Sequence, residues 1–106
     1  MIAMKVNFNR PIVGFDRKPL QKKSGEEIRM DEEVCLHLYN ANTMKGVPLS
    51  DEQKYKAYSL CMRISDNPSS IEITTEEGTL IKGICHEKMS AGAYGQVVDA
   101  IENNIH

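Results

Sequence analysis

The chain has 106 residues, of which 41% are apolar, and a formal net charge of −2. This length suits one domain with a modest core, and the slightly acidic balance argues against a dedicated nucleic-acid binder, whose affinity rests on clustered positive charge. No run approaches the roughly 18 apolar residues of a membrane span and no secretory signal is visible, so we expect a cytoplasmic protein without membrane contact.

The chain opens with a β-rich segment. Residues 4–8 alternate apolar and polar side chains, which predicts a half-buried strand. Pro11 ends that strand or confines it to a sheet edge, because proline has no amide hydrogen to donate. Residues 12–15 continue it after a kink, residues 16–20 read as a turn, and Ser24-Gly25 marks a second one. We expect a β-hairpin or an irregular arm whose apolar side packs on the helices.

Two helices are predicted next. The first begins at Asp31, a good N-cap, and should end near Thr43. The second opens at Ser50, which forms a capping box with Gln53, and ends before Pro68. The expected apolar row of the first helix is Val34, Leu38 and Ala41, with Cys35 and Tyr39 beside it. That of the second is Ala57, Cys61 and Ile64, flanked by Tyr58, Leu60 and Met62.

The third helix has the clearest start signal in the chain. Thr74 and Glu77 form another capping box, because the threonine hydroxyl and the glutamate carboxylate can each bond the other residue's amide. Gly78 and Gly83 each weaken this helix by roughly 0.5–1 kcal/mol, so packing must hold it together. The extended residues 71–73 in front of it form either a strand that joins the N-terminal sheet or a lead into the helix.

A fourth helix, capped by Ser90, raises the possibility of a helix-turn-helix over residues 74–104. Its recognition helix, Ala91 to Asn104, contains no Lys or Arg, and its Asp99 and Glu102 would be repelled by phosphates. Gln96 alone could read a base. We therefore disfavour this interpretation.

Together these segments predict an α+β, mainly helical domain. A β-hairpin or arm, residues 1–30, precedes four short helices within residues 31–106, all in one compact domain.

No constellation of residues indicates catalysis or metal binding. Cys35, Cys61 and Cys85 fall on apolar helix stripes, which is typical of reduced core thiols. Cys35-x-His37 and Cys85-His86 lack the spacing of zinc ligands, and such close neighbours point to different sides of a helix. Most paired carboxylates fall in the first turns of helices, where the helix dipole favours them. We expect no catalytic residue, no cofactor and no metal.

Positive charge is concentrated in the first quarter of the chain. Such an asymmetry marks a candidate contact surface for an acidic partner or for nucleic acid. The candidate partner-binding residues are Arg10, Arg17, Lys18, Lys22 and Lys23.

The chain resembles a loose group of small uncharacterised proteins encoded by tailed bacteriophages and prophages. The similar stretches are Lys5-Val6-Asn7-Phe8, Asp16-Arg17-Lys18-Pro19-Leu20, Ile71-Glu72-Ile73-Thr74-x-Glu76 and Tyr94-x-Gln96-Val97-x-Asp99-Ala100-Ile101. Arg17 departs from the usual Asp-Gly pattern of the turn. The resemblance implies a phage product in the cytoplasm of a bacterial host, with no assigned catalytic residues.

These observations lead to two functional hypotheses. The first is a non-enzymatic phage protein that acts through protein–protein contact, as a morphogenesis or accessory factor. The alternative is a weak nucleic-acid-binding accessory protein that uses the same basic arm. The partner's identity and the oligomeric state stay open.

Overall fold

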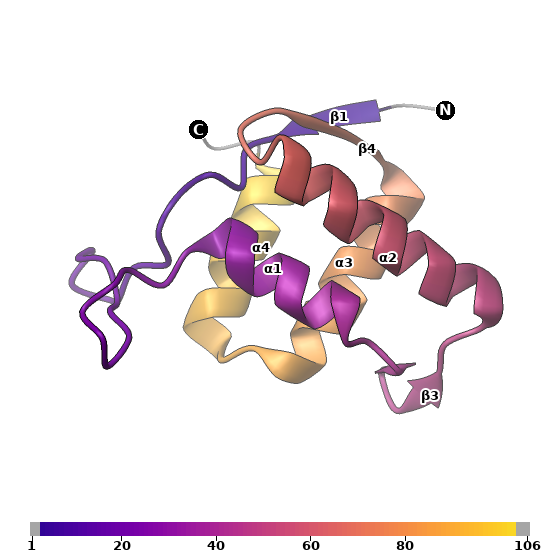
Figure 1. Ribbon diagram of the computed structural model, residues 1–106, viewed down its shortest axis with the longest axis horizontal. Coiled ribbons are helices and arrows are strands. Elements are labelled where there is room, and N and C mark those ends of the chain that lie inside the picture. The colour runs from indigo at the N-terminus through magenta and orange to yellow at the C-terminus, as the bar shows by residue number, and fades with distance from the viewer. Residues whose placement is uncertain (1–2, 104–106) are drawn as a thin grey trace.

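The computed structural model describes residues 3–103 (Figure 1); the predicted helical region beyond them, 104–106, lies outside the described residues. The elements in chain order are β1 (Ala3–Val6), α1 (Met30–Tyr39), β2 (Thr43–Met44), β3 (Val47–Pro48), α2 (Asp51–Asp66), β4 (Ile71–Thr74), α3 (Thr75–Lys88) and α4 (Ala91–Glu102). The predicted α+β class is confirmed.

The N-terminal strand pairs with the strand that precedes α3. β1 and β4 run antiparallel with Met4 opposite Ile73 and Val6 opposite Ile71, and they lie side by side along one edge of the molecule (Figure 1). The alternation of side chains buries Val6, Ile71 and Ile73. Residues 71–73 are therefore a strand that joins the N-terminal one.

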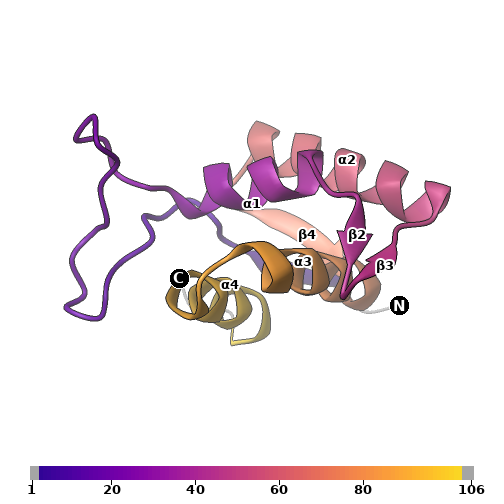
Figure 2. The same cartoon turned by 90° about the horizontal axis from the view of Figure 1, so that it is seen from below.

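The four helices form two layers around one apolar core. α1 and α2 lie next to each other in one layer, and α3 and α4 lie in the other (Figure 2). Ile81, Ile84 and Cys85 of α3 are buried between the layers. The glycines of α3 permit this packing: a Cβ at Gly78 would meet Ile101 of α4, and one at Gly83 would meet Met44 of β2.

The three predicted start signals from α2 onward are confirmed. Ser50 and Gln53 form the capping box of α2, and Thr74 and Glu77 form that of α3. The hydroxyl of Ser90 accepts from the amide of Ala93 at 3.3 Å and caps α4.

The predicted limits of the first helix are wrong at both ends. α1 begins at Met30 rather than Asp31, because burial of the Met30 side chain and a 2.8 Å bond from its amide to the Arg10 carbonyl draw it into the first turn. It ends at Tyr39, well before Thr43. The chain instead turns into the small β2–β3 hairpin, at a tip where Lys45 and Gly46 both have positive φ.

The N-terminal segment is an irregular arm rather than a regular hairpin. It leaves the body beside α1 and projects outward (Figures 1 and 2). Between residues 10 and 29, the side chain of Ile12 is fully buried, while those of Phe15 and Leu20 are exposed. The expectation that the arm packs its apolar side on the helices is therefore wrong for its outer part.

Candidate functional site

The arm is held together by a closed ring of backbone hydrogen bonds. The amide of Ile12 donates to the carbonyl of Ile28 at 2.7 Å, that of Leu20 to Ile12 at 2.9 Å, and that of Ile28 to Leu20 at 2.8 Å. Three chain segments thus meet at its base, and the two turns between them point away from it. We call residues 14–27 the outer arm.

The two turns of the outer arm have the same geometry. In each, the first residue's amide donates to the fifth residue's carbonyl, at 3.0 Å for Gly14 to Lys18 and 2.8 Å for Lys22 to Glu26. The fourth residue of each has positive φ, as in a hairpin turn with a bulge: Gly25 at 90° and Arg17 at 64°. Because an L side chain in this conformation costs roughly 1 kcal/mol, Arg17 occupies a position that favours glycine.

The outer arm presents an aromatic ring among basic side chains. Phe15 is fully exposed at the first turn. Four of the five predicted contact residues, Arg17, Lys18, Lys22 and Lys23, are exposed on the two turns, and Lys22 pairs with Glu32 of α1 at 3.6 Å. The fifth, Arg10, is half-buried at the root of the arm. The structure thus places Arg17 and Lys18 on one turn, Lys22 and Lys23 on the other, and Arg10 apart from both.

Acidic side chains moderate the charge of the arm. Residues 10–29 contain six basic and three acidic residues. Arg29, at its base, pairs with Asp31 at 3.4 Å and with Glu27 at 3.9 Å. This surface is therefore only mildly basic. Such a surface suits contact with a protein of mixed charge better than contact with nucleic acid, because phosphate binding requires a dense stripe of positive charge.

Gln96 fastens the arm to α4. Its side-chain Oε1 accepts from the amide of Val13 at 2.9 Å, and its Nε2 donates to the carbonyl of Val13 at 2.8 Å and to that of Gly92 at 3.0 Å. The side-chain amide therefore replaces a strand partner for Val13. Gln96, which the helix-turn-helix hypothesis would have used to read a base, has an internal role.

A second exposed apolar surface lies on α1 and α2. The rings of Tyr39 and Tyr58 are 6.3 Å apart, and those of Tyr55 and Tyr58 are 6.2 Å apart. Tyr55 is 72% exposed and Tyr39 is 64% exposed. Leu36 and Met62 are exposed on the same two helices, and we call these five residues the tyrosine face.

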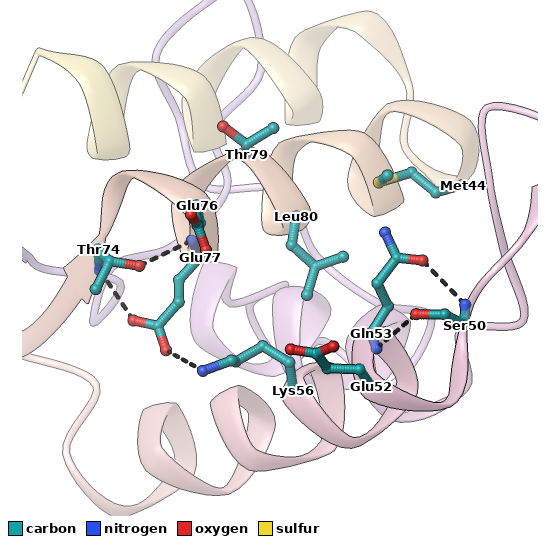
Figure 3. Close-up of a pocket in the computed structure, with 10 residues that line it drawn as sticks. All are labelled: Met44, Ser50, Glu52, Gln53, Lys56, Thr74, Glu76, Glu77, Thr79 and Leu80. Atoms are coloured by element: carbon teal, nitrogen blue, oxygen red, sulfur yellow. Dashed lines mark hydrogen bonds and ion pairs between the residues drawn. The ribbon is translucent and has the colours of Figure 1, made fainter.

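A pocket of about 320 Å³ lies between the first turns of α2 and α3 (Figure 3). The two capping boxes flank it, so the hydroxyls of Ser50 and Thr74 each accept an amide hydrogen. Its lining residues are Met44, Ser50, Glu52, Gln53, Lys56, Thr74, Glu76, Glu77, Thr79 and Leu80. This set contains no histidine or cysteine, and four of its polar residues, Ser50, Gln53, Thr74 and Glu77, form the two capping boxes.

Glu77 is the most buried acidic side chain of the pocket, at 5% exposure. It accepts from the amide of Thr74 at 2.9 Å and from the guanidinium of Arg63 at 2.8 Å, and the ammonium of Lys56 is 3.5 Å away. Burial alone would raise the pKa of this carboxyl, but these donors and charges outweigh it and hold the pKa below its ordinary value of 4.5. The carboxylate is therefore a structural anion.

The three thiols are free, as predicted for core cysteines: Cys61 and Cys85 are buried, and Cys35 is half-buried with its thiol 3.4 Å from the Cys61 carbonyl. Burial raises the pKa of Cys85 to about 12, and burial with the neighbouring Cys61 raises that of Cys35 to about 12. His86 is exposed and stacks edge-on against Tyr94 at 5.4 Å. Cys35 and Cys85 are thus not set up as nucleophiles, since the thiolate is the reactive form of a cysteine.

Residues 3–103 contain neither a metal-binding cluster nor a membrane-spanning helix. No group of three or more His, Cys, Asp or Glu side chains in this range is arranged to hold a metal ion. None of the helices in the same range is long and apolar enough to cross a membrane.

Comparison with known proteins found no match: no protein-family model, curated protein or solved structure is significantly similar to this chain.

Sequence reasoning missed Phe15, Gln96 and most of the tyrosine face. Phe15 lies between Gly14 and Asp16, two residue types that are common in turns. An apolar residue inside a turn was therefore the signal that could have predicted its exposure. Tyr55, Tyr58 and Met62 are spaced three and four residues apart and form a second stripe on α2, opposite the buried row. The role of Gln96 had no signal, because its partner is 83 residues away in the chain.

Proposed function

We propose that the protein acts by binding another protein through its outer arm, with no catalytic step of its own. The observation that carries the proposal is the fully exposed ring of Phe15 beside Arg17, whose backbone has the positive φ that favours glycine. Aromatic and arginine side chains dominate the energetics of protein interfaces. Strained residues occur preferentially where function retains them.

The anchoring of the arm supports this role. The backbone ring at its base and the Gln96 bonds to Val13 hold the turns in place before any partner arrives. A preorganised loop loses less conformational entropy on binding than a flexible one. From the resemblance to small phage proteins, we place the partner among the proteins of a tailed phage or its bacterial host.

Replacing Arg17 with glycine tests the proposal. Arg17→Gly should raise the free energy of unfolding by about 1 kcal/mol, because it relieves the left-handed backbone, and it should weaken partner capture several-fold, because it removes the guanidinium. If capture is unchanged while stability rises, Arg17 is not part of the contact. The matched control is Lys45→Gly, which relieves the same backbone conformation in the β2–β3 turn and should leave capture unchanged.

A photo-crosslinking amino acid at position 15 identifies the partner directly. In infected cells, it should give a discrete protein adduct that the same amino acid at exposed Lys88 does not give. Lys18→Glu with Lys23→Glu should reduce that adduct; Lys22 is left unchanged because it pairs with Glu32. Equal adducts from both positions would contradict the proposal.

The nucleic-acid alternative makes a different prediction. It requires a mobility shift with DNA or RNA at low salt that disappears as salt is added, because counterion release drives such binding. A nuclease-sensitive adduct at position 15 together with this shift would replace the protein-binding proposal.

A further inference from the structure

Cys35 of α1 and Cys61 of α2 are neighbours in the fold, although 26 positions separate them in the chain. The Sγ atom of Cys35 donates to the carbonyl oxygen of Cys61 at 3.4 Å. Burial raises the pKa of the Cys35 thiol, and the charge and hydrogen bonding of the Cys61 thiol raise it further. The two sulfur atoms therefore lie within reach of each other where α1 meets α2.

The packing of α1 on α2 keeps these two positions opposite each other. The helices lie next to each other in one layer (Figure 2). About one turn farther along each helix, the rings of Tyr39 and Tyr58 are 6.3 Å apart, which fits the same antiparallel register. Packed helices have axes about 8–10 Å apart and Cα atoms about 2.3 Å from each axis, so facing positions reach the roughly 4.4–6.8 Å that a disulfide spans.

The two thiols differ in their access to solvent. Cys35 is half-buried, so a small molecule can approach its sulfur, whereas Cys61 is only 6% exposed. The third thiol, that of Cys85, is fully buried in α3. An accessible thiol beside a second one is the arrangement in which an oxidised first sulfur is resolved by its neighbour.

We infer that Cys35 and Cys61 form a reversible disulfide that links α1 to α2 when the protein meets a small-molecule disulfide as oxidant. With oxidised glutathione, the Cys35 thiolate attacks one glutathione sulfur and bonds to it, and the other glutathione leaves as a thiolate. The Cys61 thiolate then attacks the Cys35 sulfur and releases the second glutathione. The two protein thiols lose two electrons and two protons, which the oxidant gains.

Proximity, and not an activated thiol, drives this reaction. The first exchange is slow, because the raised pKa of Cys35 leaves little thiolate. The second exchange is intramolecular and is favoured by the contact between the two residues. The disulfide does not depend on the proposed arm contact, so either can fail without the other.

Incubation of the purified full chain with oxidised glutathione at pH 8 tests the inference, with peptide mapping by mass spectrometry as the readout. The native wild type should lose two hydrogen atoms and join the peptides of Cys35 and Cys61, while Cys85 stays reduced. In urea all three thiols are available and should give mixed pairs, so selective pairing reports the native contact. A native protein that stays reduced, pairs through Cys85 or links two chains overturns the inference.

Single variants separate the roles of the two thiols. Cys61→Ala should keep one glutathione on Cys35, because no second thiol releases it, whereas Cys35→Ala should stay unmodified, because Cys61 is buried. Cys85→Ala is the matched control and should form the disulfide like the wild type. A wild type that keeps as much glutathione on Cys35 as Cys61→Ala does would show that the two sulfur atoms cannot bond, which overturns the inference.

The stability of the oxidised protein shows whether the bond fits the native fold. The disulfide closes residues 35–61, with the β2–β3 hairpin among them, into a loop and so restricts the unfolded chain. The urea midpoint of the oxidised wild type should therefore be about 1–2 M higher than that of the reduced protein. An unchanged or lower midpoint would mean that α1 and α2 must move apart from their native packing to form the bond, and it would overturn the native link.

Discussion

Removal of the Glu77 carboxylate tests how the start of α3 is held. Its two oxygens accept from the Thr74 amide and the Arg63 guanidinium, with Lys56 at 3.5 Å. A hydrogen bond to a charged group contributes about 1.5–3 kcal/mol when one partner is buried. The side chains of Arg63 and Lys56 are 41% and 51% exposed, so solvent screens their charges. We therefore assign about 1.5 kcal/mol, the low end of this range, to each of the two hydrogen bonds of the carboxylate. Glu77→Ala should therefore lower the free energy of unfolding by about 3 kcal/mol.

Glu77→Gln separates the cap from the charge. The glutamine keeps an oxygen for the Thr74 amide but turns a donor toward Arg63, so we expect a loss of about 1–2 kcal/mol. The matched control is Gln53→Ala in the capping box of α2, which is more exposed and uncharged and should cost only about 0.5–1 kcal/mol. Urea unfolding followed by circular dichroism measures all three losses.

The pH dependence gives the sign of the charge contribution. The pKa of Glu77 is lowered in the folded state, so its carboxylate stabilises the fold above the unfolded value of 4.5, and this contribution is lost as the pH falls through the folded pKa. The advantage of the wild type over Glu77→Gln should be full at pH 7 and shrink below pH 4.5. Equal stability of the two proteins at pH 7, or a difference that stays constant into acid, would refute the reasoning.

Three further predictions concern the core and the arm. With a pKa of about 12, only about one in ten thousand Cys35 or Cys85 thiols is ionised at pH 8, so iodoacetamide should label both slowly in the native protein and quickly in urea; rapid native labelling of either would revive a catalytic thiol. Gly83→Ala should lower the free energy of unfolding in urea by about 1 kcal/mol, because the added methyl group meets Met44 of β2. Gly95→Ala, in open space on α4, should raise it by about 0.5–1 kcal/mol. A Gly83→Ala variant that is more stable than the wild type would contradict this account of the packing. Gln96→Leu removes three hydrogen bonds, so the residue-13 amide should exchange at least about tenfold faster with deuterium, and unchanged exchange would mean that the arm is held by its own ring alone.

The helix starts were predictable because their signals are local. The capping boxes at Ser50 and Thr74 depend on a hydroxyl and a side chain three residues away, and no distant contact competes with them. The same locality explains the buried rows of α2 and α3 and the free core thiols. Where a long-range contact intervened, prediction was wrong: the amide of Met30 bonds the Arg10 carbonyl, and α1 begins one residue early.

The sequence by itself therefore determined the α+β class, the capped helix starts from α2 onward and the grouping of basic residues in the first quarter of the chain. Only the tertiary structure decided that β4 pairs with β1, that Gln96 holds the arm, and that Phe15 is exposed on it. These features join residues 60 or more positions apart or depend on the direction of a turn. Contacts between such distant residues stabilise the protein only after the chain has folded and the entropy cost of closing the loop has been met, so no local pattern predicts them. Tyr39, Tyr58 and Met62 lie beside the apolar rows in the sequence pattern, and only the packed structure shows that all three are exposed.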